Sequence, residues 1–244
     1  MMNVEKSEFD VPVIKKGQLA EFDPQIAVEK GALLLVDKPL EWTSFDVVAK
    51  TRSALRIKKV GHAGTLDPRA TGLLILCLGK ATKIAESVQA TEKEYTGTMR
   101  LGATTATEDG EGEEENHRPF EHLSSQEITD AAESFLGESD QIPPMFSARK
   151  VKGTRLYKLA RQGKEVERTA KKIFLRGIEI TAINLPYVNF RVVCSKGTYI
   201  RSLARDIGEK LGTGAYLSAL RRTRSGPFHV EDGVTIEEIK KFEA

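Results

Sequence analysis

The sequence predicts an α+β fold with a mixed, mostly antiparallel sheet flanked by helices. Short buried-strand and alternating segments occur along the whole chain. Amphipathic segments of helical period fall between them without the regular rhythm of a parallel sheet. Of the 244 residues, 40% are hydrophobic and 30% charged, which is typical of a globular chain with one core and appendages.

The first part of the chain contains four predicted strands and one predicted helix. Residues 1–29 are predicted to form an N-terminal arm with one strand near residues 11–14. The three buried strands are expected over residues 32–36, 73–78 and 95–101. The helix is expected to begin with Ser44 as its N-cap and Asp46 in its first turn, and to end near the basic pair at residues 58 and 59.

The clearest helical pattern begins at Ser124. Ser124 and Glu127 have the spacing of a capping box, and apolar residues recur at helical period from Ile128 to Leu136. Gly137 is placed to end this helix.

The C-terminal half continues the mixed pattern. Residues 188–194 alternate between apolar and polar, as in a half-buried strand. Thr198 is placed to cap a helix that ends at Gly212, and a short helix is expected over residues 235–242.

The composition excludes several classes of protein. The longest apolar runs are far shorter than the ~20 residues that a membrane helix needs. The first ten residues mix acidic and basic side chains and lack the pattern of a signal peptide, so we expect a cytoplasmic protein. Cys77 and Cys194 lie in apolar segments and are expected to be buried reduced thiols. The four histidines show no metal-ligand spacing, so we expect no metal.

The net charge of +2 hides two opposite blocks. Residues 108–115 carry six acidic and no basic residues, and a solvated loop is expected there. Residues 148–176 carry 11 basic and 2 acidic residues, which form either a solvated face or a surface for a polyanion. If the fold gathers the further basic groups at residues 196–205 and 221–224 on the same face, nucleic acid is the favoured partner.

Residues 61–72, GHAGTLDPRATG, form a glycine-rich loop that leads directly into a predicted buried strand. Asp67 precedes Pro68, and most Asp-Pro pairs are simple turns. The loop has neither GxGxxG spacing nor the Gly-Lys-Ser/Thr of a phosphate-binding loop. The alternative to a turn is that the strand holds the Asp67 carboxylate rigidly for chemistry.

This loop is one of six segments that occur in a characteristic order. They are KGALLLVDKP (30–39), TSFDVV (43–48), GHAGTLDPRATGLL (61–74), EKEYTGTMRLG (92–102), PPMFSARKVKGTRLYKLARQG (143–163) and CSKGTYIRSLARDIGEKLG (194–212). Together they resemble the bacterial TruB family, and the similarity runs from about Lys30 to Phe228. It implies a pseudouridine-synthase fold with a catalytic domain over residues 30–230, followed by a short C-terminal helix within residues 231–244.

The resemblance implies a tRNA pseudouridine(55) synthase. Such an enzyme flips uridine 55 out of the tRNA T arm, breaks its glycosidic bond and rejoins the base through carbon. This isomerisation needs no metal or other cofactor. The implied partner is tRNA, with no membrane and no required protein partner, and we expect a monomer. The alternatives are a pseudouridine synthase of different RNA specificity and a non-catalytic tRNA-folding helper.

The resemblance also assigns roles to residues by position. It makes Asp67 the catalytic aspartate and Arg201 its basic partner. Tyr95 is the aromatic residue that packs on the target uracil, and Tyr199 and Leu220 are walls of the uridine pocket. Flipping a uridine costs a few kcal/mol, which stacking on an aromatic ring offsets.

Three further residues belong to the same implied cleft. His62 occupies the space that the flipped nucleotide leaves in the T loop, and Lys38 and Pro39 line the cleft. Two mechanisms stay open: covalent addition of the aspartate to the sugar or base, and removal of a proton from the ribose.

Residues 143 to about 172 resemble the RNA-gripping insertion of the family, often called the thumb, and coincide with the basic block. The expected contacts to the RNA backbone are Arg149, Lys150, Lys152, Arg155 and Arg161. Each phosphate contact is expected to contribute roughly −0.7 to −0.9 to the log-log salt slope of binding.

The sequence departs from the family pattern in three places. Glu41 stands where glycine is usual, and Arg69 stands where leucine is frequent. The chain ends at Ala244, whereas many relatives continue into a C-terminal RNA-binding domain of the PUA kind, so we expect no full PUA domain.

Overall fold

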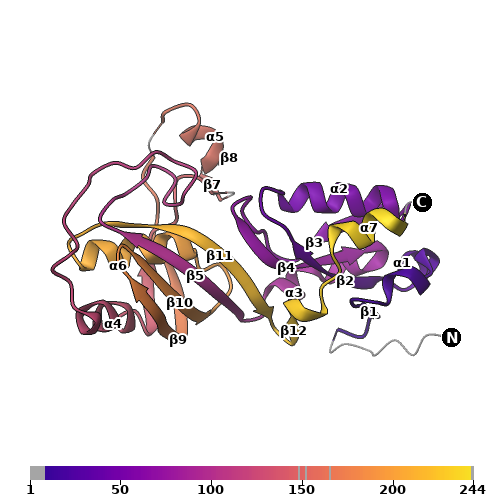
Figure 1. The fold of residues 1–244 in the computed structure, drawn as a ribbon. Coiled ribbons are helices and arrows are strands. Elements are labelled where there is room, and N and C mark those ends of the chain that lie inside the picture. The colour runs from indigo at the N-terminus through magenta and orange to yellow at the C-terminus, as the bar shows by residue number, and fades with distance from the viewer. Residues whose placement is uncertain (1–8, 148, 152, 165, 243–244) are drawn as a thin grey trace. The chain divides into compact units, whose positions relative to one another are not determined.

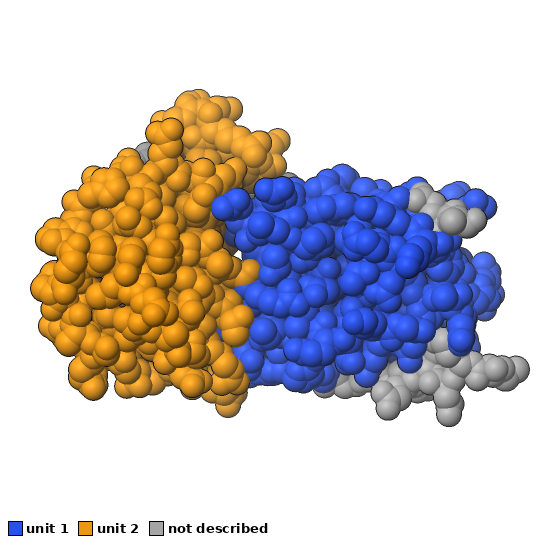
Figure 2. All heavy atoms as spheres, in the orientation of Figure 1, with its two compact units in different colours: residues 1–95, 221–244 blue, residues 96–220 orange. Residues whose placement is uncertain are grey.

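The computed structural model describes residues 9–147, 149–151, 153–164 and 166–242. The chain divides into two units, coloured separately in Figure 2: unit 1 comprises residues 1–95 and 221–244, and unit 2 comprises residues 96–220. Two strands, β5 (Lys93–Leu101) and β11 (Ala215–Ser225), contribute residues to both units. Because the division falls inside strands, no run of linker residues marks it in the sequence.

Unit 1 contains a sheet with the strand order β1, β2, β4 and the C-terminal part of β11, while β3 also pairs with β4 and β12 with β11. The bounds are β1 (Val13–Ile14), β2 (Ala32–Lys38), β3 (Val60–His62), β4 (Ala70–Leu78) and β12 (Phe228–His229). β1 runs parallel to β2, whereas β2 and β3 run antiparallel to β4. The strands predicted at residues 11–14, 32–36 and 73–78 are therefore confirmed.

Short helices complete unit 1. They are η1 (Leu19–Glu21), α1 (Pro24–Glu29), α2 (Ser44–Ala54), η2 (Gly79–Ile84), α3 (Ala85–Gln89), η3 (Val230–Asp232) and α7 (Ile236–Phe242). α2 and α7 pack against each other (Figure 1). In addition, α2 contacts β3, and α7 contacts β2. The helix predicted over residues 235–242 is confirmed as α7.

α2 begins at Ser44, but its N-cap is Thr43 rather than Ser44. The Thr43 hydroxyl accepts a hydrogen bond from the Asp46 N–H at 3.0 Å, and the Asp46 carboxylate accepts one from the Thr43 N–H at 2.9 Å. This reciprocal pair is a capping box. The helix stops at Ala54, short of its predicted end, because Arg56 lies in the left-handed region with a φ of 52°.

The described part of the N-terminal arm, residues 9–29, packs into unit 1. Val13 pairs with Leu33 in the parallel register of β1 and β2. The ring of Phe9 stacks on that of Phe228 with centroids 6.1 Å apart. The arm thus covers an edge of the sheet and contributes to the core.

Unit 2 contains a sheet with the strand order β11, β5, β10, β9 and β6, formed with the N-terminal part of β11. The bounds are β6 (Gly137–Gln141), β9 (Lys171–Asn184) and β10 (Tyr187–Cys194), and these strands form antiparallel pairs. The helices α4 (Ser125–Glu133) and α6 (Ile200–Lys210) contact each other, and α4 packs on β9 (Figure 1). The predicted α+β class, with a mixed and mostly antiparallel sheet, is confirmed.

α4 has the predicted capping box. Ser124 Oγ accepts from the Glu127 N–H at 3.2 Å, and the Glu127 carboxylate accepts from the Ser124 N–H at 2.8 Å. The helix ends at Glu133, and turns continue to Leu136, whose N–H donates to the Glu133 carbonyl at 3.0 Å. Gly137 then changes the chain direction with a φ of 85° and begins β6.

α6 begins at Ile200, and its N-cap is Tyr199 rather than the predicted Thr198. The Thr198 hydroxyl instead donates to the carbonyl of Ser195 at 2.9 Å. Gly212 follows the end of the helix with a φ of 74°, as its predicted role requires.

Two long strands, β9 and β11, are not predicted by the sequence pattern. β9 begins with Lys171 and Lys172 and therefore resembles the preceding basic block. Its pairing with β10 has two register shifts, which break the simple alternation of buried residues. β11 carries three arginines within residues 221–224, and these too resemble a solvated charge run.

The predicted thumb contains a hairpin and one short helix in unit 2 (Figure 1). They are β7 (Lys150–Val151), β8 (Thr154–Arg155) and α5 (Leu156–Ala160). Leu156 is fully buried, and its N–H donates to the carbonyl of Arg149 at 2.8 Å.

Within the described ranges, no helix is both long and apolar enough to cross a membrane. Cys77 in β4 and Cys194 in β10 are buried reduced thiols, as predicted. Burial raises the pKa of Cys77 to about 12, so this thiol is protonated at neutral pH.

Candidate active site

The loop that carries Asp67 connects β3 to β4 in unit 1, and Asp67 itself is half-buried. Gly72, at the end of the loop segment, has a φ of 98°, and a Cβ there would overlap the backbone of Arg222. Only glycine fits this position, because both the conformation and the close approach exclude a side chain. The tight glycine-rich turn expected from the sequence is therefore present, and it leads into a fully buried part of β4.

The start of α2 holds this loop in place. The Ser44 hydroxyl donates to the carbonyl of Leu66 at 3.0 Å and accepts from the Leu66 N–H at 2.9 Å. The Glu41 N–H donates to the carbonyl of Pro68 at 2.8 Å. The residues on both sides of Asp67 are thus tied to the segment that precedes α2.

A buried lysine lies beneath the same two segments. Lys38 has no exposed surface, and its ammonium donates to the carbonyls of Pro39 at 2.9 Å, Trp42 at 2.6 Å and Pro68 at 3.4 Å. Burial lowers the pKa of Lys38 to about 8, an effect that the charge of Asp67 partly opposes. Lys38 therefore joins the segment before α2 to the Asp67 loop through their backbone carbonyls.

This pKa predicts how stability depends on pH. Between about pH 8 and 10.5, the folded state binds fewer protons at Lys38 than the unfolded chain, so the free energy of unfolding rises with pH. Across this pH range, we expect the free energy of unfolding of the wild type to rise by up to about 3 kcal/mol relative to that of Lys38→Met. Urea titrations at several pH values measure the difference, with Lys80→Met at an exposed site as control. A difference that does not change with pH would contradict the prediction.

Arg222 in β11 supports the loop from another direction. Its side chain is 1% exposed. Nε donates to the carbonyl of Leu73 at 2.7 Å, and Nη2 donates to that of Gly64 at 3.1 Å. A buried guanidinium therefore joins the start of the Asp67 loop to β4, where sequence reasoning expected only a charged surface.

His62 ends β3 and is half-buried. Its Nδ1 is buried and has no hydrogen-bond partner among the described residues. Burial, followed by the positive charge of Arg222, lowers the pKa of His62, so its imidazole is neutral at pH 7. A neutral ring next to this loop offers both a flat apolar surface and a polar atom.

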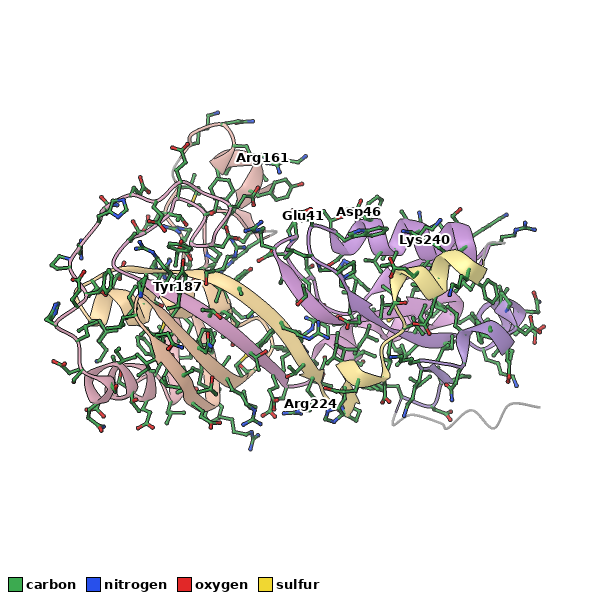
Figure 3. The ribbon with its side chains drawn as sticks, in the orientation of Figure 1. Glu41, Asp46, Arg161, Tyr187, Arg224 and Lys240 are labelled. Atoms are coloured by element: carbon green, nitrogen blue, oxygen red, sulfur yellow. The ribbon has the colours of Figure 1, made fainter. Side chains whose placement is uncertain are left out.

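Glu41 has a φ of 66°, in the left-handed region that favours glycine. The turn keeps a left-handed conformation, although a side chain makes it costly. Figure 3 shows Glu41 before α2 and Lys240 on α7; the Lys240 ammonium lies 5.8 Å from the centroid of the Trp42 ring.

Glu41→Gly is expected to raise the free energy of unfolding by about 1 kcal/mol, because glycine adopts this conformation without the steric cost of Cβ. Chemical denaturation measures the change. The matched control is Glu133→Gly in α4, where the same replacement should destabilise by roughly 0.5–1 kcal/mol. An equal decrease in the free energy of unfolding for both variants would contradict the prediction.

In unit 2, Arg201 projects from the first turn of α6 and is 5% exposed. Its guanidinium donates to the carbonyls of Thr107 at 2.9 Å and Phe146 at 2.8 Å. It also lies 3.7 Å from the carboxylate of Asp109, which is itself buried. Arg201 therefore joins α6 to two loops of the same unit.

The acidic block at residues 108–115 is only partly a solvated loop. Glu108 and Asp109 turn inward: Glu108 forms an ion pair with Arg205 of α6, and Asp109 approaches Arg201. Glu114 accepts a hydrogen bond from the Tyr216 hydroxyl at 2.7 Å. The expectation of a solvated loop is thus wrong for Glu108 and Asp109, because the arginines of α6 need partners, whereas Glu114 is exposed as expected.

The other predicted pocket residues lie on three elements. Tyr95 in β5 is 8% exposed, and Leu220 in β11 is half-buried. Tyr199 is half-buried at the N-cap of α6, two residues before Arg201. The structure thus brings Lys38, Pro39, His62 and Asp67 together on adjoining segments of unit 1, and Tyr199 and Arg201 on one helix of unit 2.

The predicted RNA-backbone residues of the thumb have different environments. Arg149 donates to the carbonyl of Thr169 at 3.0 Å, which closes the base of the thumb. Arg161 is exposed at the end of α5, with its guanidinium 5.7 Å from the centroid of the Tyr157 ring (Figure 3). Lys150 and Arg155 are register partners in the β7–β8 hairpin. Lys152 lies outside the described residues.

Comparison with known families agrees with this geometry. Residues 52–200 match the sequence model of the TruB family pseudouridylate synthase (N terminal domain), and residues 201–244 match that of the tRNA pseudouridylate synthase B C-terminal domain. The chain belongs to the TruB family. Neither matched description names a PUA domain. The TruB family is a family of pseudouridylate synthases, which are isomerases.

Relatives and solved structures support membership of the TruB family. The tRNA pseudouridine synthase B of Chloroherpeton thalassium is 51% identical over 214 residues, which cover 86% of this chain and 89% of the relative. That of Phocaeicola vulgatus is 50% identical over 220 residues, covering 88% and 94%. A chain of the crystal structure of a Cbf5-Nop10-Gar1 complex is 31% identical with a TM-score of 0.69, and the similarity covers 98% of this chain but 60% of that one. The pseudouridine-synthase fold is therefore confirmed.

The arginines outside the thumb form contacts that the sequence does not predict. Arg221 pairs with Asp37 and Arg224 with Glu92, while Arg222 is buried and bonds to backbone carbonyls. Arg201 and Arg205 are likewise engaged within unit 2. Each of these arginines therefore has a structural partner within its own unit.

Sequence reasoning missed two buried charged residues, Asp109, which lies near Arg201, and Arg222, which holds the Asp67 loop. Asp109 is one of six acidic residues within residues 108–115, and the sequence does not set it apart from the others. Arg222 lay in a run of three arginines that looks solvated. No local pattern distinguishes them, because their partners are far away in the chain.

Proposed function

We propose that this TruB protein isomerises uridine 55 in the T arm of tRNA to pseudouridine. The observation that carries the proposal is the Asp67 loop, whose backbone is held by Ser44, Glu41, Lys38 and Arg222. A carboxylate needs such a rigid support if it is to meet a flipped nucleotide without reorganisation. Family membership and the names of the relatives agree with this reaction.

We propose that Asp67 is the catalytic residue and that Arg201 serves the same reaction as its basic partner. Tyr95 stacks on the target uracil, while Tyr199 and Leu220 enclose it. Base flipping costs a few kcal/mol, and aromatic stacking contributes about 1–3 kcal/mol per base, so these rings offset most of that cost.

We further propose that His62 fills the space that the flipped nucleotide leaves, because its half-buried ring beside the Asp67 loop offers a flat surface for stacking. Lys38 and Pro39 support the cleft through the backbone contacts of Lys38. The exposed guanidinium of Arg161 and the other basic residues of the thumb contact RNA phosphates.

The test uses purified protein and an unmodified tRNA transcript, with no metal or cofactor added. Isomerised uridines are mapped by selective derivatisation and primer extension. We expect one pseudouridine per tRNA, at position 55. Product at a different position would support another RNA specificity, and the absence of product would contradict the proposed function.

A further inference from the structure

The side chain of Gln141 holds the backbone of Tyr199. Gln141 ends β6 and is 3% exposed. Its Nε2 donates to the Tyr199 carbonyl at 3.0 Å, and its Oε1 accepts from the Tyr199 N–H at 2.8 Å. The carboxamide therefore pairs with both polar backbone groups of one residue, as a neighbouring strand would.

Tyr199 needs such support because of its place at the N-cap of α6. Its own side chain makes no capping hydrogen bond. Its carbonyl accepts the Leu203 N–H at 3.1 Å in addition to the bond from Gln141. Gln141 thus fixes the point where the chain enters α6, and with it the direction of the Tyr199 side chain.

Gln141 is itself held firmly. It pairs with Lys171 in the last register position of β6 and β9, where the thumb leaves the sheet. The next residue, Ile142, accepts a hydrogen bond from Arg205 at 3.2 Å. Further along, the Phe146 carbonyl accepts one from Arg201 at 2.8 Å. The segment after Gln141 is therefore fastened to the same helix that Tyr199 caps.

We infer that Gln141 is a positioning residue, which sets the Tyr199 side chain for the reaction. This inference rests on the proposed function, in which Tyr199 encloses the uracil. A misplacement of about 1 Å in a site of this kind costs about 100-fold in rate. RNA binding, by contrast, depends mainly on phosphate contacts made elsewhere, so loss of Gln141 should affect the rate and not the affinity.

The experiment compares three variants of the full chain. Gln141→Met removes both hydrogen bonds at similar volume, and Gln141→Glu keeps the acceptor and loses the donor. Gln126→Met is the matched control, since Gln126 is exposed on α4 and donates to the Asp130 side chain. Single-turnover rates with enzyme in excess, product amplitudes, dissociation constants for the tRNA transcript and melting temperatures are measured for each.

For Gln141→Met, we expect the single-turnover rate to fall about 10- to 100-fold, with full product amplitude and a dissociation constant within about 3-fold of the wild type. The rate of Gln141→Glu should lie between that of Gln141→Met and that of the wild type. If Gln141→Met does not fold, Gln141→Glu is used in its place. Gln126→Met should match the wild type.

A double mutant separates positioning from a general structural role. In a Tyr199→Ala background, Gln141→Met should lower the rate by less than about 3-fold, because its effect passes through the missing ring. The same loss in both backgrounds would overturn the inference, as would an unchanged rate in the single variants. Absence of product with the wild type would contradict the proposed function itself.

Discussion

Asp67→Asn is expected to abolish pseudouridine formation, with a fall in rate of roughly 10⁴-fold or more. Asparagine keeps the shape of the side chain but lacks the negative charge that either open mechanism requires. Single-turnover assays on the tRNA transcript measure the rate. The supports of the loop are backbone contacts to Leu66, Pro68 and Gly64, so the variant should fold and bind tRNA nearly as the wild type does.

The control for Asp67→Asn is Asp130→Asn on the exposed surface of α4, which should retain the full rate. If Asp67→Asn still forms product at a rate near that of the wild type, the assignment of the catalytic carboxylate is wrong. If the wild type binds tRNA and never forms product, the protein is the folding helper that the sequence left as an alternative.

Arg201→Met should lower both the free energy of unfolding and the single-turnover rate. It leaves the buried Asp109 carboxylate without its guanidinium and the carbonyls of Thr107 and Phe146 without their donor. Breaking a buried pair in this way costs about 3–5 kcal/mol. We also expect the single-turnover rate to fall by about 10²–10³-fold, because a positive charge serving the reaction is removed. Denaturation and rate measurements test the two effects separately.

The double variant Arg201→Met, Asp109→Asn distinguishes the two effects. Replacing Asp109 by asparagine removes the unpaired charge and keeps an acceptor for the Thr107 hydroxyl, which lies 2.6 Å from the carboxylate. Much of the lost stability should return, while the rate stays low. Recovery of the rate together with the stability would mean that Arg201 has a structural role alone.

Local patterns in the sequence predict the elements that depend on neighbouring residues. The capping box of α4 needs only Ser124 and Glu127, three residues apart, and it is present as predicted. The strands β2 and β4 are continuous apolar runs whose burial follows from their composition. The strand β9 is not predicted in this way, because register shifts in its pairing with β10 interrupt the alternation of buried and exposed residues.

Charge shows the limit of such reasoning most clearly. In the sequence, Asp109 and Arg222 belong to runs of like charge, and such runs usually lie in solvent. In the structure both side chains are buried, because Arg201 and the carbonyls of Gly64 and Leu73 offer partners from distant parts of the chain. Whether a charge is solvated or structural depends on contacts that a local pattern does not contain.

The sequence by itself determined the TruB family, the α+β class and the loop that carries Asp67, because these depend on ordered motifs and on local apolar period. Only the tertiary structure decided which charged side chains are available to a substrate and which are used to hold the loops. The physical reason is that a buried charged or polar side chain requires a partner, and for Arg222, Arg201 and Gln141 the partners lie between 55 and 158 residues away in the chain.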